Sequence, residues 1–292
     1  MAPPILLEAQ ILVQGFGQNI NLSSHERHQG GWRSPRAEIG KVRGGWAAAI
    51  SGRTFWPLSY GDMGVSDVHR MAARDNAALC IAMWRAHSLG VERFNGCVAC
   101  AGTPPRLYPN VVTADPEVDP RDQMASVAER AEQVSGTFFV KDSYRALALD
   151  NFGFEPMFEA CWIHRSASLA AGATWLNWRP VTGVEEAGAW ETVWSGGADE
   201  PALFLPAFLA TPGVTMLAGW ADGAIKAGCI VTATGAVAGL SNVFGDALEV
   251  ISAVATTFSG FDLVGYENGD LLEAALEAGF LKAGDLVVWK RL

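Results

Sequence analysis

The chain has 292 residues, half of them hydrophobic, which is enough for two domains of ordinary size that each bury a core. Its formal net charge of −10 argues against a nucleic-acid partner, because phosphate backbones are bound by clustered Lys and Arg. No apolar run approaches the roughly 20 residues of a membrane-spanning helix, so we expect no membrane insertion. The five cysteines follow no disulfide framework and Glu8 interrupts the apolar N-terminus, which favours a cytoplasmic protein.

Residues 1–65 show little periodicity and no strong helix signal. They carry Trp32, Trp46 and Trp56 in Arg- and Gly-containing surroundings. Two interpretations remain open. One is an irregular extension ahead of the folded part, and the other is a short lid or a dimer arm anchored by these tryptophans; only the dimer arm would imply a homodimer.

A regular pattern begins after this segment. Ser66 or Asp67 can cap a helix that runs to about residue 88, because apolar residues recur on one stripe there. Two extended segments follow at residues 93–101 and 107–113, separated by a Gly-Thr-Pro-Pro turn.

Helix signals then recur on both sides of the middle of the chain. Asp119 followed by Pro predicts a helix start, since Asp caps and Pro is favoured at the first helical position. Residues 173–181 read as a strand, and residues 182–185 have the form of a capping box that opens a helix to about residue 194. A further helix is predicted at residues 201–210.

Three strands are predicted next, at residues 214–220, 224–234 and 236–244, joined by tight turns. Gly245 then starts a helix, with Leu248 on its apolar stripe.

The chain contains an internal repeat, with one copy in its middle and one at its end. Residues 138–165 and 262–292 each contain an apolar strand, a polar corner, a short helix, Gly-Phe and a Trp-bearing strand. In both copies an Asx residue, Asp142 or Asn268, stands twelve residues before the Phe. Repetition at about half the chain length predicts two related domains.

This order of elements resembles the GNAT superfamily of acyl-CoA-dependent N-acetyltransferases. The match covers about residues 170–292 fully, and residues 66–168 resemble a shortened version of the same fold. The resemblance implies an α/β protein, with an α+β mixed sheet, built from two GNAT-like domains at residues 66–168 and 169–292. Each domain would have a central, mostly antiparallel sheet flanked by helices, behind the irregular extension 1–65.

In the family, the fourth strand runs into a loop of the form Gln/Arg-x-x-Gly-x-Gly/Ala, whose backbone amides hold the pyrophosphate of acetyl-CoA at a helix N-terminus. The resemblance therefore implies acetyl-CoA as co-substrate. The residues at this place are Asn242, Val243, Phe244, Gly245, Asp246 and Ala247.

A loop of this kind can bind an anion for physical reasons that do not depend on the family. Unpaired amides of a first helical turn and the positive end of the helix dipole favour an anion. Two residues depart from the pattern, since Asn242 replaces a long side chain and Asp246 brings a carboxylate to the diphosphate position. The alternative is an ordinary strand-to-helix corner capped by Asp246.

The closing segment also resembles the family, whose chains commonly end Asn-x-x-Ala-x-x-Leu-Tyr-x-x-x-Gly-Phe before a strand. Asn268, Gly279 and Phe280 keep this frame, and Asn268 is a further cofactor-binding candidate. The Tyr that protonates the departing thiolate in many members is replaced by Ala275 here.

Two neighbouring residues are candidates for the missing catalytic roles. Tyr266 is the candidate donor to the thiolate, and Glu267 is the candidate base that takes a proton from the amine, directly or through water. The alternative is that the two side chains alternate across a strand end, one buried and one solvated.

The first copy lacks the glycine turn. Residues 113–120 replace it with three carboxylates and two prolines, a poor cradle for a diphosphate, so we expect the cofactor only in the second domain. Cys97 and Cys100 lie three apart on a strand and would point to opposite faces, which argues against a metal site.

Two functions remain. The first is an acyltransferase that moves an acetyl group from acetyl-CoA to an amine of a small molecule or peptide, with strand amides polarising the carbonyl. The second is a catalytically inactive CoA-binding or scaffold protein of the same fold. The acidic charge favours a cationic amine acceptor, although it also serves solubility alone.

Overall fold

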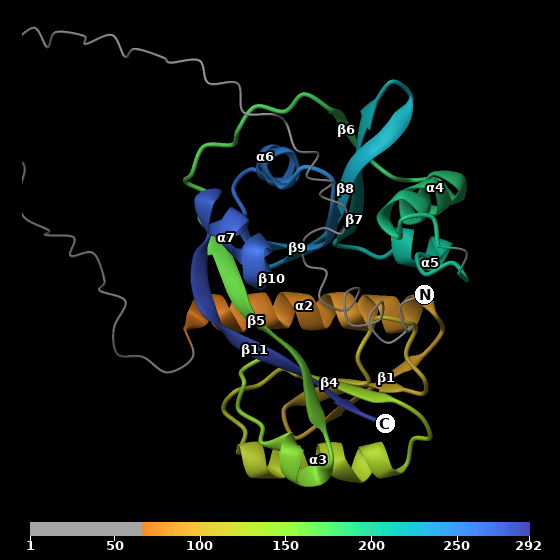
Figure 1. Ribbon diagram of the computed structural model, residues 1–292, viewed down its shortest axis with the longest axis vertical. Helices are drawn as coiled ribbons and strands as arrows, with labels where there is room; N and C mark the ends of the chain where they lie inside the picture. The colour runs from red at the N-terminus through yellow and green to blue at the C-terminus, as the bar shows by residue number, and fades with distance from the viewer. Residues whose placement is uncertain (1–65, 199) are drawn as a thin grey trace, which may run out of the picture. The chain divides into compact units, whose positions relative to one another are not determined.

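A mixed sheet of eleven strands organises residues 66–198 and 200–292, the part of the chain that the computed structural model describes. The strand order is β1-β2-β3-β4-β11-β5-β10-β9-β8-β7-β6 (Figure 1). Neighbours are antiparallel except for two parallel pairs, β3 with β4 and β9 with β10. The predictions for residues 1–65, including the three tryptophans, lie outside the described residues.

The strands are β1 (Gly90–Phe94), β2 (Cys97–Ala101), β3 (Val111–Thr113), β4 (Phe138–Asp142), β5 (Glu155–Arg165), β6 (Asn177–Pro180), β7 (Val214–Ala221), β8 (Ala224–Thr234), β9 (Val237–Phe244), β10 (Asp262–Glu267) and β11 (Leu281–Arg291). The helices are α2 (Asp67–Ala86), α3 (Pro120–Glu132), α4 (Val184–Trp194), α5 (Pro206–Leu209), α6 (Ala247–Thr257), α7 (Gly269–Glu277) and the 3₁₀ helix η1 (Leu149–Phe152).

Helix α2 is shared by both ends of the sheet. Ser66 caps it by accepting a hydrogen bond from the His69 amide at 3.2 Å, as the sequence predicts. The helix contacts β1 and β2 at one end of the sheet and β8 to β10 at the other. Figure 1 shows it between β1–β4 and β7–β10. One face of each group of strands is therefore covered by the same helix.

The sheet faces that point away from α2 are covered by different helices in the two groups of strands. Helix α3 packs Val127 and Ala131 against β4, while α6 and α7 cover β8 to β10. On β10, Leu263 packs with α6 and α7, whereas Val264 packs with Ala72 of α2. Successive side chains of a strand point to opposite faces, so residue parity along β10 tells which helix each side chain meets.

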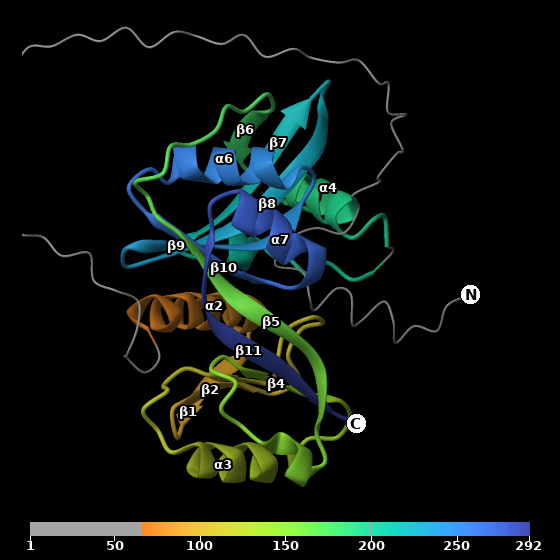
Figure 2. The same ribbon diagram turned by 60° about the vertical axis from the view of Figure 1, so that its left-hand side comes forward.

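The closing strands of the two repeated segments are exchanged. β11 pairs with β4 and β5, and β5 pairs with β11 and β10, so each closing strand lies beside the other copy's strand. Figure 2 shows β5 and β11 running side by side between the two groups of strands. The described residues all belong to one structural unit, and the predicted domain boundary at residue 169 stays a prediction.

Several predicted elements are confirmed, namely α2, α3 and the three strands β7 to β9. The predicted strand 93–101 is wrong, because Asn95 and Gly96 both have positive φ and turn the chain into the β1–β2 hairpin. The Asn-Gly pair is a strong signal for such a turn.

Three helix predictions also need correction. The capping box at 182–185 is wrong, because α4 has Gly183 as N-cap without a side-chain cap bond. Only Pro206–Leu209 of the predicted helix 201–210 is helical. Leu248 is 59% exposed rather than buried, because the apolar face of α6 is carried by Val250 and Val254.

Candidate functional site

Strands β9 and β10 run together for only three residue pairs and then part. The parallel pairing begins at Asp262 with Val237 and ends at Val264 with Gly239. Beyond this point β10 still pairs with β5 and β9 still pairs with β8. The facing edges of residues 240–244 and 265–267 therefore have no strand partner, which leaves an opening for a group that hydrogen-bonds to main chain.

A β-bulge lies on β9 at this opening. Ser241 pairs with Ile230 and Phe244 with Gly228, so Asn242 and Val243 together oppose one residue of β8. Asn242 has φ of 51°, in the left-handed region. A bulge of this kind re-aims the local backbone, and here it does so beside the opening.

Gly245 connects β9 to α6 and has no room for a side chain. Its φ is 85°, and an added Cβ would lie 2.5 Å from the Cβ of Ala227 and 2.7 Å from the carbonyl oxygen of Lys226. The glycine is therefore required by backbone conformation and by packing on β8. Behind it, Asp246 caps α6 by accepting from the Glu249 amide at 3.0 Å, and further amides of the first turn have no intrahelical acceptor.

The carboxylate of Glu249 is occupied elsewhere, although the residue lies in the first turn of α6. It accepts hydrogen bonds from the amides of Trp175 and Leu176 at 3.0 and 2.9 Å and from Trp178 Nε1 at 3.0 Å. Three donors offset its charge and tie the segment before β6 to the helix. Asp246 is thus the carboxylate with which an anion at this helix end would compete.

Tyr266 and Glu267 lie on opposite faces of β10, and both are buried. Tyr266 faces α2 and its hydroxyl accepts from Lys141 Nζ at 3.3 Å. Glu267 is on the α6 and α7 side with neither carboxyl oxygen hydrogen-bonded within the described residues. Burial raises the pKa of Glu267 well above its usual value, which favours the neutral form of the carboxyl. The alternative in which one of the two is solvated is wrong, because both are buried. The catalytic roles of Tyr266 and Glu267 stay predictions.

A small cavity of about 40 Å³ lies on the α2 side of the opening. Its polar lining comes from both halves of the chain: Asn76, Cys80, Tyr108, Lys141, Ser241, Asn242 and Tyr266. Sequence reasoning named Tyr266 and Asn242 among these as functional residues. Lys141 had a usable signal, since it is a charged residue directly after the apolar residues 138–140 of a predicted strand, whereas nothing in the sequence near Tyr108 marks it.

Two solved structures are similar to this chain in overall fold. The GCN5-related N-acetyltransferase from Kribbella flavida aligns with a TM-score of 0.54 and 14% identity, over 78% of this chain and 96% of that chain. The chain has the GNAT fold. A functionally unknown conserved protein from Staphylococcus epidermidis aligns with a TM-score of 0.51 and 8% identity, over 68% of this chain and 92% of that one. No family model and no curated protein matches the sequence.

Helix α7 keeps the residue spacing of the repeated segment, but it has no Tyr at the position where the family has one. Asn268 is the N-cap residue of α7, and its side-chain amide donates to the Glu159 carbonyl on β5 at 3.1 Å. Ala275, at the position of the family's Tyr, is buried against the core beneath α7. The structure ties Asn268 to β5, and its role toward a cofactor stays a prediction.

Asp75 is a second candidate that the sequence analysis missed. It projects from α2 onto Gly239, the last paired residue of β9, where an added Cβ would overlap its carboxylate. Thr234 Oγ1 donates to it at 2.6 Å. Burial raises the pKa of Asp75 to about 7, despite this hydrogen bond. A carboxyl that titrates near neutrality therefore stands on the α2 side of the opening.

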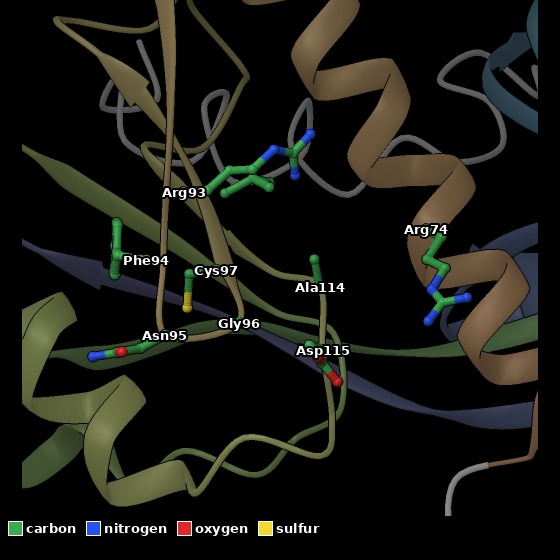
Figure 3. A pocket seen from close by; sticks show the side chains of 9 residues that line it. Arg74, Arg93, Phe94, Asn95, Gly96, Cys97, Ala114 and Asp115 are labelled. Atoms are coloured by element: carbon green, nitrogen blue, oxygen red, sulfur yellow. The ribbon is translucent and has the colours of Figure 1, made fainter.

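The first half of the chain has a larger pocket of about 460 Å³ at the equivalent place, where β3 ends. Ala114 and Asp115, which follow β3, line it together with the β1–β2 hairpin. Figure 3 shows Arg93 on the hairpin and Arg74 on α2 at different sides of this pocket. No glycine turn enters a helix there, because residues 114–119 separate β3 from α3.

Other chemistries have little support in the described residues. No group of His, Cys, Asp and Glu in them is placed to hold a metal ion. Cys97 and Cys100 pack in different core clusters, which confirms that they point to opposite faces. None of the helices in this part of the chain is long and apolar enough to cross a membrane.

Proposed function

We propose that the protein transfers an acetyl group from acetyl-CoA to an amine. One observation carries the proposal: β9 parts from β10 at Gly239, bulges at Asn242 and enters α6 through Gly245. This combination presents backbone amides at an opening and a helix N-terminus beside it. A thioester carbonyl and a diphosphate are the two groups that such donors recognise.

The residues present fit acetyl-CoA in most respects. Amides of the first turn of α6 would hold the diphosphate, and the bulge at Asn242 and Val243 would polarise the thioester carbonyl. Acetyl-CoA supplies an acyl group activated by its thioester. Asp246 is the feature that opposes binding, because its carboxylate shares the helix end with the diphosphate.

The reaction needs one proton acceptor and one proton donor. The amine nitrogen attacks the thioester carbonyl, the C–N bond forms, the C–S bond breaks and the sulfur leaves as thiolate. A cofactor held by α6 lies on the side that Glu267 faces, so the Glu267 carboxyl, whose pKa is raised by burial, gives its proton to the thiolate. Asp75 accepts the amine proton through water, because its pKa lies near neutrality on the opposite side. Tyr266 then orients the acceptor beside Asp75.

The alternative is a protein of the same fold that binds CoA without turnover. Asp246 at the helix end and Ala275 in place of the family's Tyr favour it. The two functions differ in one observable, the release of free thiol when amines are added to protein saturated with acetyl-CoA.

Calorimetric titration with acetyl-CoA tests the site itself. Gly245 is unsuitable for this, since any side chain there disturbs the fold. Leu248→Glu is better, because Leu248 is 59% exposed in the first turn of α6 and the new charge would face the diphosphate. Val184→Glu is a matched control, since Val184 is 62% exposed in the first turn of α4.

We expect Leu248→Glu to weaken acetyl-CoA binding about tenfold, from one added like charge at close range, and Val184→Glu to leave it unchanged. No heat of binding with the wild type would end the proposal. Equal losses in both variants would place the cofactor elsewhere.

A further inference from the structure

We propose that the acceptor amine carries a carboxylate, which Lys141 and Tyr108 receive in the small cavity on the α2 side of the β9–β10 opening. The inference rests on the proposed acyl transfer, and it specifies the acceptor class. It replaces the expectation, drawn from net charge alone, that the acceptor is simply cationic.

The first observation is an ammonium group without a counter-ion. Lys141 is 6% exposed, and its Nζ donates to Asn76 Oδ1 at 2.8 Å and to the Tyr266 hydroxyl at 3.3 Å. It also lies 4.6 Å from the centre of the Tyr266 ring. None of these partners is a carboxylate, and no carboxylate of the described residues forms an ion pair or hydrogen bond with Lys141. Buried charges are normally paired, because an unpaired one loses its hydration without compensation.

The charge on Lys141 is retained in this setting. Burial works to lower the pKa of the ammonium, but Tyr266 and Cys80 act in the opposite direction and the pKa is raised overall. Asp75 neighbours Asn76 on α2, but its carboxylate accepts a hydrogen bond from Thr234 and forms none with Lys141. A Lys ammonium has three donors, and the two bonds above leave one for a further acceptor.

The second observation is an unused donor in the same cavity. Tyr108 comes from the loop between β2 and β3, and it is 7% exposed. Its hydroxyl is buried without a hydrogen-bond partner in the described residues. Buried hydroxyls are nearly always hydrogen-bonded, so this one points to a missing acceptor.

The volume of the cavity limits which part of the acceptor can enter it. A cavity of about 40 Å³ admits one small polar group rather than a whole metabolite. Ser241 and Asn242 of β9 also line it, so the group would lie next to the bulge at which the thioester carbonyl is polarised. A carboxylate a few bonds from a reacting amine satisfies this geometry, as in an amino acid.

Formate is the probe for the cavity, because it is a carboxylate without further bulk. Saturation-transfer NMR measures its contact with the wild type, Lys141→Met and Tyr108→Phe, with methylammonium as the cationic control. Lys141→Met should fold at least as well as the wild type, since an unpaired buried charge is replaced by an apolar chain of similar length. Tyr108→Phe removes only the unpartnered hydroxyl.

We expect transfer to formate in the wild type, its loss in Lys141→Met and a reduction in Tyr108→Phe, with none to methylammonium in any protein. Absence of transfer in the wild type, or equal transfer in wild type and Lys141→Met, would overturn the proposal. This arm does not use acetyl-CoA, so its outcome is separate from that of the proposed function.

Thiol release provides the second arm, with each amino acid compared with its carboxamide. We expect kcat/KM to be at least about tenfold higher for the acid, the effect of one charged hydrogen bond. Lys141→Met should bring the ratio of kcat/KM for the acid to kcat/KM for its carboxamide close to one, by raising KM for the acid. Equal use of acids and amides by the wild type would contradict the inference, while failure of acetyl-CoA to bind would contradict only the proposed function.

Discussion

The segments β3–α3–β4 and β9–α6–β10 are built on one plan. In each, two parallel neighbouring strands are joined by a helix, and α2 covers the face opposite to that helix. They differ in the corner between the first strand and the helix. After β9 a single glycine turn leads into α6, whereas after β3 residues 114–119 and their carboxylates intervene. The comparison predicts that strand pairing alone does not make an anion site and that the glycine corner is needed as well.

The exchanged strands make each half structurally dependent on the other. β5 and β11 each complete the other half's pairing, and α2 is packed against both groups of strands. The first half also supplies Lys141 and Tyr108 to the cavity beside the second half's opening. In this account the first half is a support and a source of acceptor contacts, while the second holds the cofactor.

Gly245→Ala should give the largest effect on stability. A positive φ and the close approach of Ala227 together cost about 4 kcal/mol of unfolding free energy. Gly153→Ala is the matched change in the first half, because Gly153 has φ of 78° but open space around it, and about 1 kcal/mol is expected. Urea unfolding of both variants measures the difference, and equal losses would show that packing at the second corner is not special.

Glu267→Gln tests the donor role on the α6 side of β10. We expect kcat for thiol release to fall about 100-fold while acetyl-CoA affinity is kept, because an amide cannot give up a proton to the thiolate. Tyr266→Phe, on the opposite face, should mainly raise KM for the acceptor. An unchanged kcat in Glu267→Gln would remove Glu267 from the mechanism.

Asp75 predicts a pH dependence of stability. Its folded pKa of about 7 lies above its unfolded value, so the folded state binds the proton more tightly and stability falls as pH rises from about 4 to 7. The shift corresponds to no more than about 4 kcal/mol, and we expect roughly half of that. Asp75→Asn should flatten the curve of unfolding free energy against pH over this range, and an unchanged slope would contradict the raised pKa.

The sequence predicted the plan of the second half well and its chemistry only partly. The bounds of β7 to β9 follow from tight turns and apolar runs, which are local signals. The exchange of β5 and β11 could not be predicted, because it depends on pairing between segments more than a hundred residues apart. Tyr108 was missed for the same reason, since its meeting with Tyr266 is set by tertiary packing alone.

Asp246→Asn should produce the smallest effect, and in the opposite direction to most substitutions. Asn caps a helix as well as Asp does, so stability should hold while the charge beside the diphosphate disappears. We expect acetyl-CoA to bind about threefold to fivefold more tightly. Asp119→Asn, at the N-cap of α3, is the first-half control and should change nothing. Equal affinities in wild type and Asp246→Asn would indicate that the diphosphate does not lie at this helix end.

The most direct test of the account compares backbone hydrogen exchange at the two corners with and without CoA. We predict that CoA slows exchange of the amides at residues 242–248 and leaves those at residues 113–121 unchanged. Protection at 113–121, or at neither corner when CoA is shown to bind, would contradict the claim that the glycine corner alone holds the cofactor.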